Sequence, residues 1–144
     1  MTILFNANSA QGASRHEVRL LVVDDLCDET EALIEMADLY HPDFVFACRR
    51  VADPSEALAA VADWDPSVVL VDLHVVTDAI SLVERLANFG SAVVALSETK
   101  IPELEDRIKK CGGRSYLAKS TNVEEIEDIL HLLGSIARDR GAHH

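Results

Sequence analysis

A chain of 144 residues, 49% hydrophobic and 26% charged, is long enough for one folded domain and too short for two ordinary ones. Its formal net charge of -12 would repel a nucleic-acid backbone, and its 13 lysines and arginines are scattered along the sequence, which argues against direct nucleic-acid binding. No apolar run approaches the roughly 20 residues that cross a bilayer, and no signal peptide opens the chain, so we expect a cytoplasmic protein without membrane contact.

The chain divides into three expected segments. Residues 1–17 are predicted to be a flexible leader, residues 18–138 the folded domain and residues 139–144 a flexible tail. The three cysteines are odd in number and widely spaced, which indicates free thiols rather than a disulfide framework or a metal motif.

The first half of the domain predicts two strands, each followed by a helix. The apolar run VRLLVV at 18–23 predicts the first strand. The helix after it is marked on one face by Leu33, Met36, Ala37 and Tyr40. The run FVFAC at 44–48 predicts the second strand. Segment 53–64 then opens with an aspartate N-cap, a proline at the first helical position and a glutamate three residues after the cap, which predicts a helix start.

The second half predicts three more units of the same kind. Strands are expected at 68–71 (VVLV), 92–96 (AVVAL) and 115–118 (SYLA). The helices after them are marked by Ala79, Leu82, Val83 and Leu86; by Ile101, Leu104, Ile108 and Cys111; and by Val123, Ile126, Ile129 and Leu133. Gly112 and Gly113 are expected to end the fourth helix, and Thr121 with Glu124 predicts a capping box for the fifth.

The polar residues that follow these strands indicate a site. Strict alternation of strands and helices predicts an α/β fold with a doubly wound parallel sheet, whose binding sites lie at the carboxyl ends of the strands. The residues expected at that edge are Asp24, Asp25, Asp72, Ser97 and Lys119. A divalent cation and Lys119 could neutralise three carboxylates gathered there, so the pattern indicates phosphoryl chemistry.

Four motifs carry a resemblance to a known family: LLVVDD, DPSEALAAVADWDPSVVLVDL, VVALS and YLAKS. In this order, from Val18 to about Arg138, they resemble the receiver domain of two-component response regulators. The resemblance implies a flavodoxin-like, five-stranded parallel sheet with strand order 2-1-3-4-5. It implies a signalling domain that takes a phosphoryl group from a histidine kinase or phosphotransfer protein, and not an enzyme beyond its own phosphorylation and dephosphorylation.

The resemblance also implies an acceptor and a metal site. Asp72 matches the phosphoacceptor, so its carboxylate would attack the phosphorus of a phosphohistidine. Mg²⁺ is expected to be held by Asp24, Asp25 and Asp72 together with the backbone carbonyl of His74.

A conformational switch is implied in the same way. Lys119 and Ser97 are expected to hold the phosphoryl oxygens, and Ser97 with Tyr116 to form the switch. The surface of the fourth and fifth helices would then change shape and be read by a protein partner or by a second copy in a homodimer. The apolar residues expected on that surface are Leu104, Ile108, Tyr116, Ile126 and Leu130.

Two stretches depart from the family pattern. After the acceptor the chain reads DLHVVTDA, in which Val75 and Val76 replace Met-Pro, one residue is missing before the next aspartate, and Ala79 replaces glycine. Glu98 stands beside Ser97 where the family carries a small residue, so its charge is expected to oppose an incoming phosphoryl donor and slow phosphorylation.

Two alternatives stay open. The first is a pseudo-receiver, an interaction module that works without phosphorylation of Asp72. The second, less favoured, is a phosphohydrolase of the haloacid dehalogenase type, which needs a second acid two residues after its nucleophile, where this chain has His74. The sequence does not identify the cognate kinase, the oligomeric state or an output domain.

Overall fold

One parallel sheet organises the chain. The computed structural model describes residues 15–24, 28–39, 41–74 and 78–142. The strands are β1 (His16–Val23), β2 (Phe44–Val51), β3 (Val68–Asp72), β4 (Val93–Ser97) and β5 (Ser115–Ala118). Their order across the sheet is β2-β1-β3-β4-β5, and every pairing is parallel, which confirms the predicted fold class and strand order.

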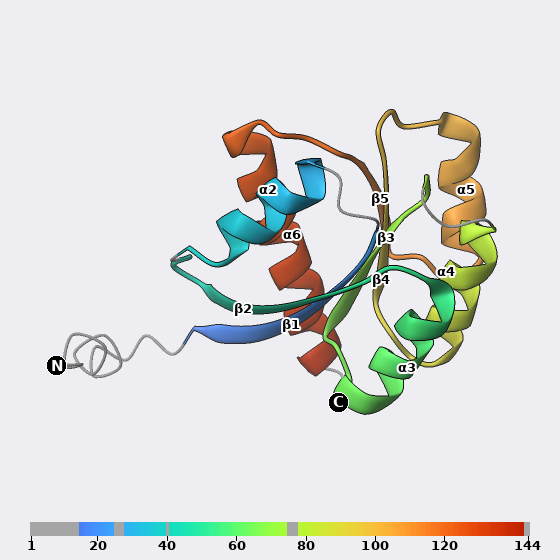
Figure 1. Ribbon diagram of the computed structural model, residues 1–144, viewed down its shortest axis with the longest axis horizontal. Helices are drawn as coiled ribbons and strands as arrows, with labels where there is room; N and C mark the ends of the chain where they lie inside the picture. The colour runs from blue at the N-terminus through green and yellow to red at the C-terminus, as the bar shows by residue number, and fades with distance from the viewer. Residues whose placement is uncertain (1–14, 25–27, 40, 75–77, 143–144) are drawn as a thin grey trace, which may run out of the picture.

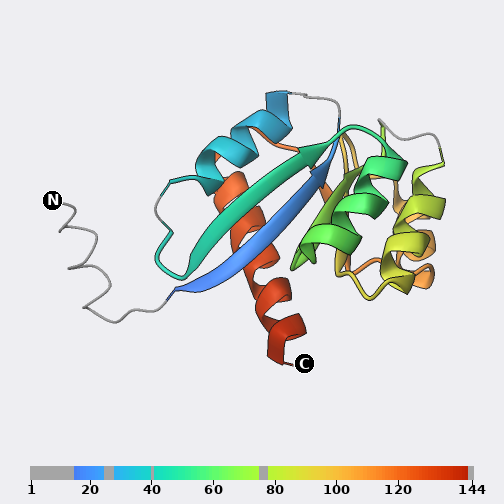
Figure 2. The same ribbon diagram turned by 60° about the horizontal axis from the view of Figure 1, so that its bottom comes forward.

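Within the described residues, five helices cover both faces of this sheet. They are α2 (Asp28–Ala37), α3 (Pro54–Trp64), α4 (Ala79–Asn88), α5 (Pro102–Lys110) and α6 (Val123–Ala142). Helices α2 and α6 lie on one face, and α3, α4 and α5 lie on the other (Figures 1 and 2). Because both faces are covered, every residue of β3 and β4 is buried, as the unbroken apolar runs predict.

The strand period of two divides the core into layers. Leu20 and Val22 of β1 point into the cluster under α2 and α6, whereas Leu21 and Val23 point into the cluster under α3 and α4. A smaller cluster under α5 contains Ile108 and Tyr116.

The helix caps confirm one prediction and correct another. At α3, the Asp53 carboxylate accepts a hydrogen bond from the Glu56 backbone N–H, as predicted. At α6, the expected box of Thr121 and Glu124 is wrong by one residue: Asn122 Oδ1 accepts from the Glu125 N–H at 3.0 Å, and Glu125 Oε1 accepts from the Ser120 hydroxyl at 2.6 Å. An asparagine caps as well as a threonine, so the residue types alone did not fix the register.

Two elements are longer than expected. Strand β1 begins at His16 instead of Val18, and its first N–H donates to the Asp43 carbonyl at 3.0 Å. Helix α6 continues to Ala142, four residues past the expected domain end at 138. Its approach to the sheet is close, since a Cβ at Gly134 would lie 2.4 Å from ring carbons of Phe44. None of the described helices has the length and apolarity of a bilayer-spanning segment.

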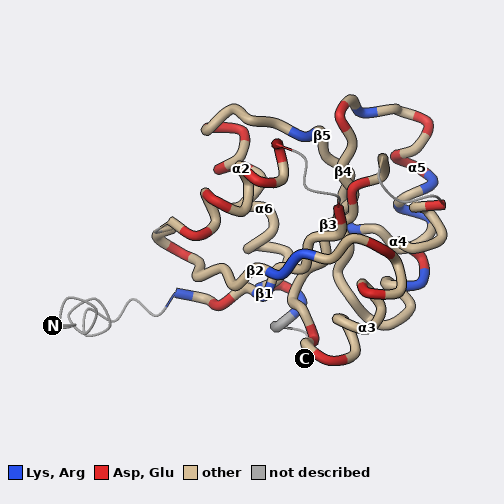
Figure 3. The backbone as a smooth tube through the Cα atoms, in the orientation of Figure 1, with Lys and Arg blue, Asp and Glu red and all other residues tan. Residues whose placement is uncertain are grey.

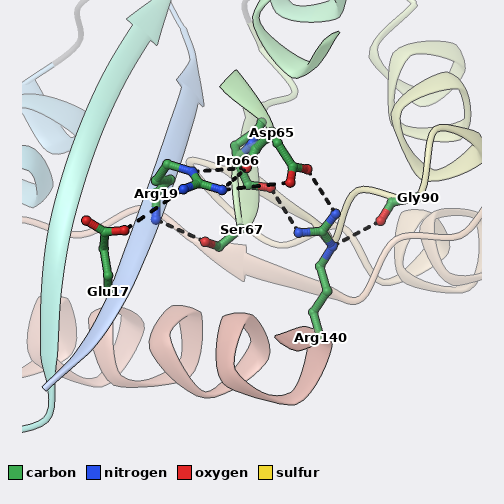
Figure 4. A network of polar contacts seen from close by, with 7 residues as sticks. All are labelled: Glu17, Arg19, Asp65, Pro66, Ser67, Gly90 and Arg140. Atoms are coloured by element: carbon green, nitrogen blue, oxygen red, sulfur yellow. Dashed lines mark hydrogen bonds and ion pairs between the residues drawn. The ribbon is translucent and has the colours of Figure 1, made fainter. Parts of the chain in front are cut away.

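The amino edge of the sheet carries an exposed polar network (Figure 4). Arg140, near the end of α6, donates to the carbonyls of Pro66 (3.3 Å) and Gly90 (3.2 Å) and pairs with the Asp65 carboxylate at 3.3 Å. Arg19 of β1 donates twice to the Asp65 carbonyl, at 3.1 and 2.8 Å. These contacts join α6 and β1 to the loops that precede β3 and β4.

Candidate functional site

The strand register brings the predicted polar residues to one edge. Val23 of β1 pairs with Val71 of β3, so Asp24 and Asp72 each follow that pair on neighbouring strands. Ser97 is the last residue of β4 and pairs with Ala118, directly before Lys119. Asp24, Asp72 and Ser97 are the buried polar residues of this edge, each at most 8% exposed.

Asp72 and Lys119 form a buried ion pair. Lys119 Nζ lies 2.7 Å from Asp72 Oδ2, and the two side chains are 4% and 1% exposed. Asp72 Oδ1 accepts a hydrogen bond from the His74 backbone N–H at 2.9 Å. Oδ2 is buried and accepts no hydrogen bond of good angular geometry from the described residues, so the contact with Lys119 is chiefly one between charges. The Lys119 N–H donates to the Ser97 carbonyl at 2.8 Å, which fixes the lysine backbone beside β4.

Asp24 is held by a residue that the sequence reasoning missed. Arg50, near the carboxyl end of β2, places Nε 2.7 Å from Asp24 Oδ1 and Nη2 3.2 Å from Oδ2, while Nη1 lies 3.0 Å from Glu31 Oε2 of α2. Burial lowers the pKa of Arg50, but hydrogen bonds to Asp24 and Glu31 raise it more, so its net pKa lies above the usual value. The guanidinium therefore remains charged beside the buried carboxylate.

Ser97 and Tyr116 belong to one directed hydrogen-bond chain. The Ser97 hydroxyl donates to the Thr99 carbonyl at 2.8 Å, and its oxygen lies 2.7 Å from the Tyr116 hydroxyl. Since serine has a single hydroxyl proton, the Tyr116 hydroxyl must be the donor to Ser97. The Tyr116 oxygen in turn accepts from the Ile101 N–H at 2.9 Å. The chain links the end of β4 to Ile101, the residue that precedes α5.

The remaining predicted positions are either exposed or outside the described residues. Asp25 and the altered loop at 75–77 fall in segments that the structure does not describe. The side chain of His74 is exposed, and its backbone N–H contacts the acceptor. Glu98, which follows Ser97 in the sequence, is also exposed.

The apolar output surface predicted from the sequence is wrong. Ile108, Tyr116, Ile126 and Leu130 are each at most 2% exposed and belong to the core. A helical stripe of apolar residues in a doubly wound fold faces the sheet, so these residues were misplaced. The exposed apolar residues of this region are Ile101 (47%) and Val123 (57%), at the beginnings of α5 and α6.

The carboxylates of Asp24 and Asp72 are the oxygen donors that this edge offers to a divalent cation. Among the described residues no three His, Cys, Asp or Glu side chains are grouped as a complete metal site. Mg²⁺ keeps several water ligands and is commonly held by one or two carboxylates, so Asp24 and Asp72 are a sufficient protein contribution. The oxygen donors thus fit a hard cation, although Arg50 occupies both oxygens of Asp24.

The two cysteines among the described residues do not compete with this site, and the third, Cys27, lies outside those residues. Cys48 and Cys111 are free thiols, as expected. Burial raises the pKa of the Cys48 thiol to about 11 and, together with nearby charges, raises that of Cys111 as well. Neither thiol is activated as a nucleophile near neutral pH.

Several solved structures with the same fold are response regulators or their receiver domains. The sequence matches no family model and no curated protein. A response regulator of red light signaling from R. palustris is 24% identical with a TM-score of 0.64, and the match covers 80% of this chain and 90% of that one. The receiver domain of the putative response regulator NarL from Mycobacterium tuberculosis is 20% identical with a TM-score of 0.67, covering 82% and 97%.

A third similar structure covers most of both chains. The CheY-like receiver domain protein from Methanospirillum hungatei is 18% identical with a TM-score of 0.67, and the match covers 91% of this chain and 100% of that one. At such identities the likeness concerns the arrangement of the backbone. The chain has the fold of response regulator receiver domains, as the resemblance of its motifs implied.

Proposed function

We propose that this chain is a phosphoacceptor receiver of a two-component signalling system. In this role Asp72 takes a phosphoryl group from a histidine kinase or phosphotransfer protein. The observation that carries the proposal is the buried Asp72–Lys119 ion pair at the carboxyl end of β3. A buried ion pair contributes little net stability compared with apolar residues of similar volume, so its presence at a ligand-binding edge favours a chemical role.

The expected chemistry follows from the contacts of Asp72. A carboxylate oxygen would attack the phosphorus of a phosphohistidine, the P–N bond would break, and the imidazole would leave with its electron pair. Lys119, 2.7 Å from Oδ2, would offset the negative charge of the acyl phosphate. Asp24, Asp25 and Asp72 with the His74 carbonyl are the proposed Mg²⁺ ligands, and the metal would neutralise the phosphoryl oxygens.

Two similar proteins support the metal and the modification. One response regulator with a TM-score of 0.60 and 18% identity was solved in an Mn²⁺-bound form. The cyanobacterial phytochrome response regulator RcpA, with a TM-score of 0.63 and 17% identity, was solved phosphorylated. We extend both properties to this chain as part of the proposal, together with a cytoplasmic location.

The hydrogen bonds of Ser97 and Tyr116 suggest how phosphorylation of Asp72 would change the protein surface. To donate to a phosphoryl oxygen, the Ser97 hydroxyl must release the Thr99 carbonyl, which also disturbs its bond with Tyr116. Tyr116 holds the backbone of Ile101, an exposed apolar residue at the start of α5. We propose that a protein partner or a second copy reads the change around Ile101 and Val123.

A small phosphodonor with Mg²⁺ tests the proposal. The intact mass of the wild-type chain should increase by one phosphoryl group, and a chelator should prevent the increase. Asp72→Asn should show none, whereas Asp78→Asn, which alters an exposed aspartate before α4, should behave as wild type. Incorporation into Asp72→Asn would contradict the assignment of the acceptor.

The pseudo-receiver remains the second candidate because of one observation. Arg50 already neutralises Asp24, as would be expected of a site that no longer needs a metal. Absence of phosphoryl incorporation into the wild-type chain, with donor and metal in excess, would favour this alternative. A phosphohydrolase is disfavoured, since the residue two positions after Asp72 is His74, with an exposed side chain, and not an acid.

A further inference from the structure

Arg50 stands where it can control the metal site. Its guanidinium contacts both oxygens of Asp24, and the side chain of that aspartate is fully buried while that of Arg50 is 19% exposed. Two-point contacts of this kind between arginine and a carboxylate are among the stronger charge-assisted hydrogen bonds. A cation from solution would therefore meet an Asp24 carboxylate whose charge is already balanced.

The same guanidinium has a second partner nearer to solvent. Nη1 lies 3.0 Å from Oε2 of Glu31, whose side chain is 49% exposed. Figure 3 shows acidic residues along α2, the helix that carries Glu31 and contains no lysine or arginine. Arg50 contacts Glu31 through Nη1 and Asp24 through Nε and Nη2. The guanidinium can therefore leave Asp24 and still keep its ion pair with Glu31.

We infer that Arg50 is an internal counter-ion that must leave Asp24 before the site can hold a divalent cation. The inference rests on the proposed metal-dependent function. It makes Arg50 a determinant of metal affinity, because only the fraction of molecules with Arg50 off Asp24 is competent to bind. In the metal-bound state Arg50 would pair with Glu31 alone.

Metal binding by matched arginine variants tests this inference. Arg49 precedes Arg50 on β2, and its guanidinium lies over the Trp64 ring of α3 with Cζ 4.6 Å from the ring centroid. Mn²⁺ alone would be titrated into wild type, Arg50→Gln and Arg49→Gln, with the free ion followed by electron paramagnetic resonance. Arg50→Gln should bind Mn²⁺ about tenfold more tightly than wild type, and Arg49→Gln should match wild type.

Thermal unfolding gives a second measurement of metal binding, and a second variant is available if the first does not fold. Without metal, Arg50→Gln leaves the buried Asp24 carboxylate without the arginine that balances its charge, so Mn²⁺ should raise the melting temperature of this variant more than that of wild type. If Arg50→Gln does not fold, Arg50→Lys serves instead: it keeps the charge but loses the two-point contact, and its affinity for Mn²⁺ should also exceed that of wild type.

The role of Glu31 has its own pair of variants. Glu31→Gln removes the second partner of Arg50, and Glu35→Gln removes a similar exposed charge one turn later on α2. Glu31→Gln should weaken Mn²⁺ binding more than Glu35→Gln does. Equal weakening would show a general charge effect and would overturn the role of Glu31 as the second partner.

The outcomes separate this inference from the proposed function. Equal or weaker Mn²⁺ binding by the folded Arg50 variant, compared with wild type, would overturn the counter-ion role while leaving the acceptor role of Asp72 intact. Absence of Mn²⁺ binding in every variant would overturn both the inference and the metal-dependent function. Phosphoryl incorporation into Asp72 is read separately, by mass.

Discussion

Both edges of the sheet carry ion pairs between basic and acidic side chains, but the pairs differ in how far they are buried. At the carboxyl edge, Asp72 pairs with Lys119 and both side chains are at most 4% exposed. At the amino edge, Arg19 and Arg140 meet Asp65, whose side chain is 73% exposed. Removing charges from water costs several kcal/mol per ion, a cost that the exposed Asp65 carboxylate avoids and the buried Asp72 carboxylate does not.

The two networks differ in what they contribute to the fold. Exposed ion pairs contribute roughly 0–1 kcal/mol and are screened by salt, so the amino edge serves mainly to join α6 and β1 to neighbouring loops. A buried pair destabilises the fold strongly when one partner is lost and adds little when both are present. Stability therefore does not account for the pair of Asp72 and Lys119, which is consistent with the phosphoacceptor role that we propose for Asp72.

The largest expected effect is at the buried pair. Lys119→Met should lower the free energy of unfolding by about 3 kcal/mol, because it leaves the Asp72 carboxylate buried without a counter-charge. The control is Lys110→Met, which breaks a pair of similar length, 2.9 Å to Asp106, between side chains more than 70% exposed. That variant should change stability by less than about 0.5 kcal/mol in urea denaturation. Equal losses would remove the contrast between the edges.

The buried hydroxyl chain at the same edge should give an intermediate effect. Tyr116→Phe removes the acceptor of the Ile101 N–H and the donor to Ser97, so we expect a loss of about 1.5 kcal/mol. Amide hydrogen exchange should quicken at Ile101 and in the first turn of α5. An unchanged exchange rate at Ile101 would contradict the hydrogen-bond chain.

Most residues of the carboxyl edge could be predicted from the sequence, but Arg50 could not. The unbroken apolar runs predicted the strands, and the residues after them, Asp24, Asp72, Ser97 and Lys119, were brought to one edge as expected. Arg50 was missed because its pairing with Asp24 depends on the register between β1 and β2. The adjacent arginines at the end of the second strand were the available signal, since parallel neighbours end at the same edge.

Other misses have a different physical cause. The apolar stripe that includes Ile108 and Ile126 was assigned to a binding surface, although periodicity identifies an apolar face without saying what covers it. The cap of α6 was displaced by one residue because serine, threonine and asparagine in a row all suit that position. The predicted ligand Asp25 and the loop at 75–77 lie outside the described residues.

At the amino edge the expected effects are smaller. Arg140→Ala removes three contacts between the end of α6 and the loops at Pro66 and Gly90, and should cost about 1 kcal/mol. The change should be local, with faster amide exchange in the last turns of α6 and none in α2. A loss as large as that of Lys119→Met would contradict the energetic contrast between the two edges.

The smallest effect is expected at Asp65 itself. Its backbone has φ 49°, a left-handed conformation that glycine adopts without strain. Asp65→Gly loses the carboxylate contacts but keeps the carbonyl to which Arg19 donates, so stability should change by less than about 0.5 kcal/mol. Asp65→Ala should cost about 1 kcal/mol more than Asp65→Gly, because alanine is strained at positive φ. Both values can be read from thermal unfolding.

Identification of the modified residue tests most directly whether Asp72 is the phosphoacceptor. The wild-type chain would be treated with a small phosphodonor and Mg²⁺ and then with borohydride, which reduces an acyl phosphate to an alcohol, and its peptides would be sequenced by mass spectrometry. If Asp72 is the phosphoacceptor, homoserine should replace Asp72 and no other aspartate. Homoserine at Asp24 or Asp78, or at no position, would contradict the assignment of the buried partner of Lys119 as the phosphoacceptor.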